Sequence, residues 1–198
     1  MASSGANDHS PVVVVTGTSG AGKGSIERIL LKRMPELELA VSATTRERRQ
    51  NEIDGLHYWF ISDEEFDRRV AEKGFLEYFT FPWGQRSGTL HSEIDRIRNA
   101  GRVPLLDLET DGALYVQEKL PEAVTIFVTA PTFDELERRL RERATESSGE
   151  IGERLDLARQ QLELADRFDH VIVNDDLERA AAEVQEIVRE RIAATMNA

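Results

Sequence analysis

The sequence predicts an α/β fold in which a parallel sheet is flanked by helices and carries an inserted lobe. Short apolar runs rich in β-branched residues, such as 12–15 and 124–130, fit strands that are buried on both faces. Helical stretches alternate with these runs, and strands joined by helical crossovers lie parallel. Residues 43–90 break the alternation with aromatic strands, short helices and turns, which predicts a lobe inserted between units of the core.

Local signals justify each element in order. Apolar or aromatic runs predict strands at 12–15, 37–42, 56–62, 75–81, 103–108, 124–130 and 170–174. Helical spacing predicts helices at 25–34, 63–73, 90–100, from 133, 153–166, and in a final stretch ending near Ile192. Ser62 with Glu65, and Thr132 with Glu135, form capping boxes that mark two of the helix starts. Polar stretches predict a loop at 44–55, a turn at 82–89 and a mobile loop at 144–152.

These elements predict one domain after a short polar tail. Residues 1–10 are expected to be disordered, and 11–198 to form the domain. Its core comprises 11–42, 91–143 and 153–198, the lobe is 43–90, and 144–152 form a lid.

Composition narrows the class of protein. The chain has 198 residues, a net charge of −12 and no cysteine, which excludes disulfides and thiolate metal sites. It contains no apolar run of membrane-spanning length and no signal-peptide pattern, so a cytoplasmic protein without membrane partners is expected. The negative charge argues against nucleic acid as a partner. Against this background, the arginine clusters at 46–49 and 138–143 indicate anion sites, whereas the four histidines have no metal-ligand spacing.

The stretch from Gly17 to Lys23 has the pattern G-x-x-x-x-G-K between an expected strand and an expected helix. Glycines let several backbone N–H groups converge on one anion, and the helix N-terminus adds unpaired donors and a partial positive charge. The lysine adds a full charge, so this stretch is predicted to hold a triphosphate. Gly24 follows the lysine where a hydroxyl residue is usual, and Ser25 comes one place later.

Several motifs, in order and spacing, resemble guanylate kinase of the nucleoside monophosphate kinase group: "GTSGAGKGS", "VSATTRERR", "GFLEY", "APTFDELERRLRER" and "VIVNDDLERA". The phosphate loop alone is typical of a very large superfamily, and the run 41–66 is far more specific. The resemblance implies a P-loop kinase fold with a nucleotide-binding lobe and a lid. It also implies transfer of the ATP γ-phosphoryl group to GMP, and to dGMP, with Mg²⁺ held mainly by phosphates and water.

The resemblance also implies roles for individual residues. The catalytic set is Lys23, Arg46, Arg139, Arg143 and Arg154. The ATP-binding set is Gly17, Ser19, Gly20, Ala21, Gly22, Lys23, Gly24, Ser25 and Asn174, the last lying against adenine. The acceptor-binding set is Ser42, Arg46, Arg49, Tyr58, Glu77, Arg86, Ser87, Thr89 and Asp107, with Ser42, Glu77, Thr89 and Asp107 lining the guanine pocket. Arginine suits these tasks because its planar fork grips phosphate bidentately and stays charged.

Glu77 is the sharpest candidate for specificity. A carboxylate accepts from both N1–H and the 2-amino group of guanine, whereas adenine has neither donor and would leave a buried carboxylate unpaired. Strand alternation in 75–81 by itself points this side chain outward, so the two interpretations stay open.

The chain departs from the family pattern in the lobe and beside the expected pocket. The family's Tyr-Tyr-Gly-Thr is Arg86-Ser87-Gly88-Thr89 here, and its Asp-x-Asp-x-Gln-Gly has Glu109 and Asp111. We expect Arg86 to offset the lost tyrosine. Other hypotheses are a same-fold kinase acting on ribose 1,5-bisphosphate or a modified guanine nucleotide, a non-catalytic interaction module, and a bare ATPase. A monomer or a homodimer is expected.

Overall fold

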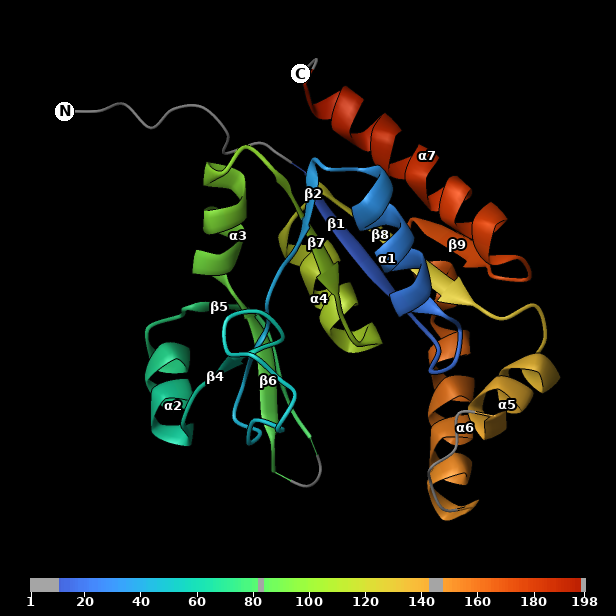
Figure 1. Ribbon diagram of the computed structural model, residues 1–198, viewed down its shortest axis with the longest axis horizontal. Coiled ribbons are helices and arrows are strands. Elements are labelled where there is room, and N and C mark those ends of the chain that lie inside the picture. The colour runs from blue at the N-terminus through green and yellow to red at the C-terminus, as the bar shows by residue number, and fades with distance from the viewer. Residues whose placement is uncertain (1–10, 82–83, 143–147, 197–198) are drawn as a thin grey trace.

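The computed structural model describes residues 11–81, 84–142 and 148–196. Its core is a parallel sheet, as predicted, and its five strands have the order β2-β7-β1-β8-β9 (Figure 1). The strands are β1 (Val12–Gly17), β2 (Leu37–Leu39), β7 (Val103–Asp107), β8 (Ala123–Thr129) and β9 (His170–Val173).

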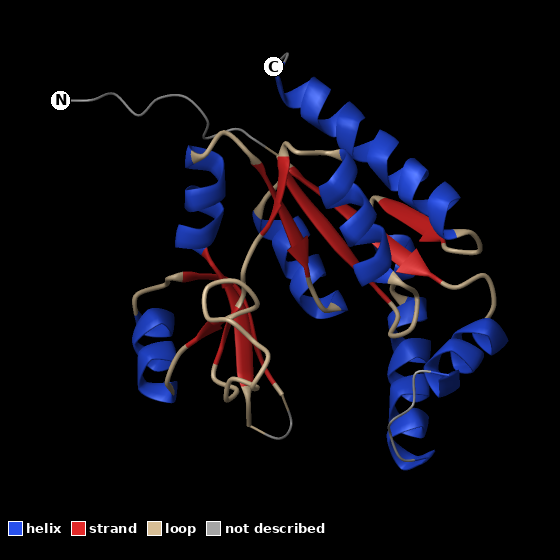
Figure 2. Cartoon of the chain, in the orientation of Figure 1, coloured by secondary structure: helices blue, strands red, loops and turns tan. Residues whose placement is uncertain are grey.

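Helices cover both faces of this sheet (Figure 2). Alternate valines of β1 feed two separate apolar clusters, because successive side chains point to opposite faces. One cluster joins the sheet to α1 (Lys23–Arg33) and α7 (Leu177–Met196). The other joins it to α3 (His91–Asn99) and α4 (Thr110–Lys119). None of the helices within the described ranges is long and apolar enough to cross a membrane.

The inserted lobe has its own four-stranded sheet in the order β4-β3-β6-β5. Its elements are β3 (Ala43–Thr44), β4 (Trp59–Phe60), α2 (Asp63–Ala71), β5 (Phe75–Thr80) and β6 (Arg86–Leu90). A small core of its own holds α2 to the sheet through Phe66, Phe75 and Leu90. The lobe lies to one side of α4 in Figure 1, and α5 (Phe133–Glu142) with α6 (Ser148–Glu163) lies to the other.

The predicted capping residues are confirmed. The hydroxyl of Ser62 accepts a hydrogen bond from the N–H of Glu65 at 3.1 Å, and that of Thr132 accepts one from Glu135 at the same distance. The glutamate side chains instead pair with arginines of their own helices, so only the first half of each box forms.

Three sequence-based expectations were wrong. The expected turn at 82–89 contains most of strand β6, which is held by partners on both sides, β3 and β5. Helix α4 was not foreseen, because it opens with Thr110, Asp111 and Gly112, which have poor intrinsic helix propensity. The strand expected at 56–62 is reduced to β4 within a looped segment.

The expected loop 144–152 is also partly wrong. Residues 148–152 belong to α6, where Ile151 packs against the apolar cluster shared with α5. Residues 144–147 and the expected tail at 1–10 lie outside the described residues. Movement of this segment as a lid stays a prediction.

Candidate active site

The phosphate loop joins the end of β1 to the start of α1. Gly22 is the N-cap of α1 and has a φ of 94°, a left-handed conformation that glycine adopts without strain. No side chain caps this helix. The N–H of Ser25 already donates to the carbonyl of Gly22 at 3.0 Å, so the N–H groups at the very start of the helix, those of Lys23 and Gly24, are the ones left for a ligand. This arrangement matches the predicted anion cradle, with Lys23 as the first residue of the helix.

Lys23 faces an aspartate at the end of the neighbouring strand. Strand β7 pairs with β1 in parallel, and the register places Asp107 beside Val15. The Nζ of Lys23 lies 3.5 Å from Oδ1 of Asp107. Asp107 was expected in the guanine pocket; the structure places it beside Lys23, and its contact with guanine stays a prediction.

Sequence reasoning missed Glu27, one turn after Lys23 on α1. Its side chain is only 6% exposed, and its Oε1 has no hydrogen-bond partner within the described residues. Burial raises the pKa of Glu27 to about 7, with a further contribution from Asp107, while Lys23 opposes the shift. The i+4 spacing from Lys23 was the signal that could have identified it.

A hollow of about 370 Å³ lies beside the loop. It is lined by Gly20, Gly22, Ser25, Arg139, Glu142, Asn174, Asp175 and Leu177. The guanidinium of Arg139 donates to the carbonyl of Asn174 at 3.0 Å and to Glu135 at 2.8 Å. The structure therefore brings Arg139 and Asn174 to the predicted ATP site. Arg143 lies outside the described residues, and Arg154 is exposed on α6.

The lobe carries the predicted acceptor arginines on the loop after β3. Arg46 donates to both carboxylate oxygens of Glu52, at 2.6 and 3.0 Å, and lies over the ring of Tyr58 at 5.4 Å. The N–H of Arg49 donates to the same carboxylate at 2.8 Å, while its side chain is exposed. The hydrogen bonds from Arg46 and from the Arg49 N–H lower the pKa of Glu52 to about 2. Glu52, which sequence reasoning also missed, thus keeps a negative charge beside these two arginines.

Glu77 points inward, contrary to simple strand alternation. The pairing of β5 with β6 shifts register between Phe75 and Glu77, so the alternation is interrupted there. The carboxylate is 8% exposed and accepts a hydrogen bond from the Thr89 N–H at 2.9 Å. A Cβ on Gly112 would lie 3.1 Å from its Oε2, so α4 approaches Glu77 closely because glycine stands there. Burial raises the pKa of Glu77.

Arg86 is engaged by helix α2. Its guanidinium pairs with Asp63 and Asp67 and lies 4.5 Å from the ring centre of Phe66. Its backbone N–H donates to the Thr45 hydroxyl at 3.0 Å, on the loop after β3 that carries Arg46 and Arg49. A direct contact between Arg86 and an acceptor phosphate stays a prediction.

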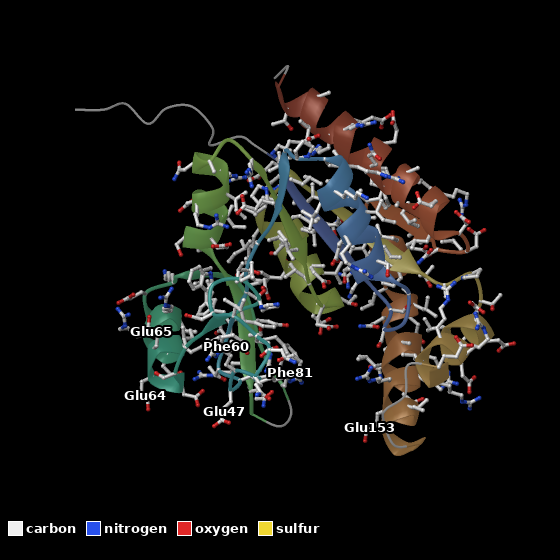
Figure 3. All side chains as sticks on the ribbon, viewed as in Figure 1. Glu47, Phe60, Glu64, Glu65, Phe81 and Glu153 are labelled. Atoms are coloured by element: carbon white, nitrogen blue, oxygen red, sulfur yellow. The ribbon has the colours of Figure 1, made fainter. Side chains whose placement is uncertain are left out.

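The remaining predicted acceptor residues lie on the same small sheet. The hydroxyl of Ser87 donates to the carbonyl of Ala43 at 3.1 Å, and the carbonyl of Ser42 accepts from Trp59 at 2.9 Å. In Figure 3, Glu47 and Phe60 lie in this lobe, whereas Glu153 lies on α6 on the other side of the molecule.

The described residues contain no group of three or more His, Asp or Glu side chains that could hold a metal ion. The Ser25 hydroxyl accepts from Arg28 at 3.0 Å, and Asp107 is the carboxylate paired with Lys23. This donor set fits an ion that is carried mainly by phosphates and water.

Comparisons with known proteins agree on one family. The family model "Guanylate kinase" matches residues 9–191. A guanylate kinase of Synechococcus sp. (strain CC9311) is 47% identical over 173 residues, covering 87% of this chain and 90% of the relative. A guanylate kinase of Prochlorococcus marinus (strain MIT 9313) is 43% identical over 188 residues, covering 95% of this chain and 98% of the relative. The crystal structure of guanylate kinase from Anaplasma phagocytophilum is similar with a TM-score of 0.70 at 27% identity, covering 91% of this chain and 86% of that one.

Proposed function

Because this chain belongs to the guanylate kinase family and phosphorylates GMP with ATP, we propose that its two phosphate-binding regions hold the donor and the acceptor of that reaction. The donor region is the phosphate loop with Lys23, Asp107, Arg139 and the hollow beside them. The acceptor region is the lobe, with Arg46, Arg49, Tyr58 and Glu77.

The reaction joins an oxygen of the GMP phosphate to the γ-phosphorus of ATP. The bond from that phosphorus to the β,γ-bridging oxygen breaks, and ADP leaves. The acceptor oxygen is already anionic and needs no general base, so the protein's task is to align two anions and neutralise charge on the transferred group. Lys23 and Arg139 serve the donor phosphates in this proposal, and Arg46 with Arg49 serves the acceptor phosphate.

Mg²⁺ neutralises charge on the β- and γ-phosphates when it is bound with the nucleotide. We assign no described side chain as its direct ligand, in keeping with the donor set beside the loop. The enzyme acts as a monomer or a homodimer in the cytoplasm, and dGMP serves as a second acceptor.

The buried carboxylate of Glu77 carries the assignment of guanine as the acceptor base. One oxygen of the Glu77 carboxylate accepts from the Thr89 N–H. Because Glu77 is buried away from water, a base that offers it no further donor should bind less tightly. A carboxylate can accept from two donors on adjacent atoms, which guanine presents at N1–H and the 2-amino group and adenine does not.

A coupled ADP-release assay across GMP, dGMP, AMP, UMP and ribose 1,5-bisphosphate tests this proposal. We expect kcat/KM for GMP to exceed that for AMP by about a thousandfold or more, and Glu77→Gln to reduce this ratio by at least about a hundredfold. Glu118→Gln, on the exposed side of α4, is the matched control and should leave the ratio unchanged. An unchanged ratio in Glu77→Gln would show that another residue reads the base, and a preference for ribose 1,5-bisphosphate would overturn the acceptor assignment.

A further inference from the structure

Asn174 lies where the last strand of the core reaches the donor site. It follows β9 directly and is 5% exposed. Its backbone N–H donates to the carbonyl of Thr129 at 2.8 Å, which ties the residue to the end of β8. The position of Asn174 is therefore set by the parallel sheet itself.

The side chain of Asn174 holds the phosphate loop. Its Nδ2 donates to the carbonyl of Ala21 at 2.7 Å, and because a carbonyl only accepts, this contact requires the amide nitrogen. A Cβ on Gly22 would lie 2.5 Å from the same nitrogen. The loop backbone is thus in direct contact with this amide, and any larger residue at 22 would push the two apart.

The backbone of Asn174 holds Arg139. Its carbonyl accepts from Nη2 of Arg139 at 3.0 Å, and the Nε of Arg139 is held by Glu135 at 2.8 Å. Arg139 and the phosphate loop line the same hollow. One residue therefore contacts both the loop that binds donor phosphates and the arginine that faces them.

We propose that Asn174 is a positioning residue that sets the phosphate loop against Arg139, and that its side chain serves the donor's phosphates by ordering this loop rather than by contacting adenine. A side chain that reads the base changes the selectivity between donor nucleotides. A side chain that orders the loop changes the affinity for every polyphosphate by the same factor, whether or not a base is attached. Inorganic tripolyphosphate, which has no base, separates these two roles.

The test measures the dissociation constants of ATP, ITP and inorganic tripolyphosphate by calorimetry on Asn174→Ala and on the parent enzyme. Loss of one buried hydrogen bond predicts about a tenfold weaker binding of all three, with the ATP to ITP ratio unchanged. Asn99→Ala, an exposed asparagine at the end of α3, is the matched control and should bind all three ligands normally.

A fall in the ATP to ITP ratio with normal tripolyphosphate binding would overturn the proposal and assign the side chain to adenine. Normal binding of all three ligands would overturn it as well. Asn174→Ser is measured in parallel in case Asn174→Ala folds poorly, because a serine fills more of the site. The same uniform loss of affinity is expected for it. Equal thermal melting temperatures of parent and variant exclude general unfolding as the cause.

Discussion

The regions proposed to hold the donor and acceptor phosphates are built by different means. In the donor region the main chain makes the proposed site: glycines, the N-terminus of α1 without a side-chain cap and a strand of fully buried valines fix its shape. In the acceptor region side chains make the site, and Arg46 is kept in place by the carboxylate of Glu52. A main-chain site tolerates many side chains outside its glycines, whereas a side-chain site depends on each charge partner.

A glutamate in each region shows the same difference. Glu27 lies buried beside the phosphate loop, and its pKa is raised to about 7. Glu52 accepts three hydrogen bonds near the surface, and its pKa is lowered to about 2. Burial dominates in the core, and pairing with arginine dominates in the lobe.

The largest effect is expected in the donor region. Lys23→Ala should lower kcat by about a thousandfold or more, because Lys23 stabilises charge that develops on the transferred group. The melting temperature should change far less than the turnover, since the carboxylate partner of Lys23, Asp107, is about half exposed and stays solvated without it. Lys119→Ala, on the exposed end of α4, is the control. Near-normal turnover of Lys23→Ala in steady-state assays would refute the donor assignment.

The two glutamates should give opposite pH profiles of stability. The folded-state pKa of Glu27, about 7, lies above its ordinary value of 4.5, so its cost to folding is absent below pH 4.5 and grows as pH rises to 7. Relative to the parent, Glu27→Gln should gain stability over this window, by at most about 3 kcal/mol.

Glu52 should behave in the reverse way. Its folded-state pKa of about 2 lies below its ordinary value of 4.5, so its contribution to stability is present above pH 4.5 and is lost as pH falls towards 2. Glu52→Gln should therefore be less stable than the parent at neutral pH, and the difference should vanish near pH 2. Urea unfolding from about pH 2 to pH 8 measures both variants, and profiles of the same sign would contradict the contrast between the regions.

Removal of Glu52, the charge partner of Arg46, should weaken binding of the acceptor GMP and leave binding of ATP unchanged. Glu52→Ala should raise the KM for GMP by about tenfold, because Arg46 loses a charge-assisted bidentate partner, and should leave the KM for ATP unchanged. Glu47→Ala, an exposed position on the same loop, is the matched control. A lower KM for GMP in Glu52→Ala would mean that the carboxylate competes with the acceptor phosphate.

The smallest effect is expected at Arg86. Its side chain pairs with Asp63 and Asp67 of α2, while its backbone N–H holds Thr45 on the loop after β3 that carries the acceptor arginines. Arg86→Ala removes only the side-chain pairs and so releases α2 from this loop, which should raise the KM for GMP about threefold to tenfold with the KM for ATP unchanged. Arg68→Ala on the exposed face of α2 controls for lost surface charge. Identical steady-state constants for Arg86→Ala and the parent would show that Arg86 has no role in acceptor binding.

The sequence by itself determined the parts of this protein that depend on local chemistry. The valines of β1, the capping residues Ser62 and Thr132, and the phosphate loop were all identifiable, because each acts through neighbours a few residues away. The motif order was enough to identify the family, since it combines several local patterns across most of the chain.

Only the tertiary structure decided which charges and strands meet. Strand β6 contains serine and glycine and exists because β3 and β5 pair with it, and a register shift in that pairing turns Glu77 inward. Asp107 reaches Lys23 because β7 lies beside β1, and Asn174 reaches Ala21 from 153 residues away. Such contacts depend on strand order and register, which no local pattern of residues encodes.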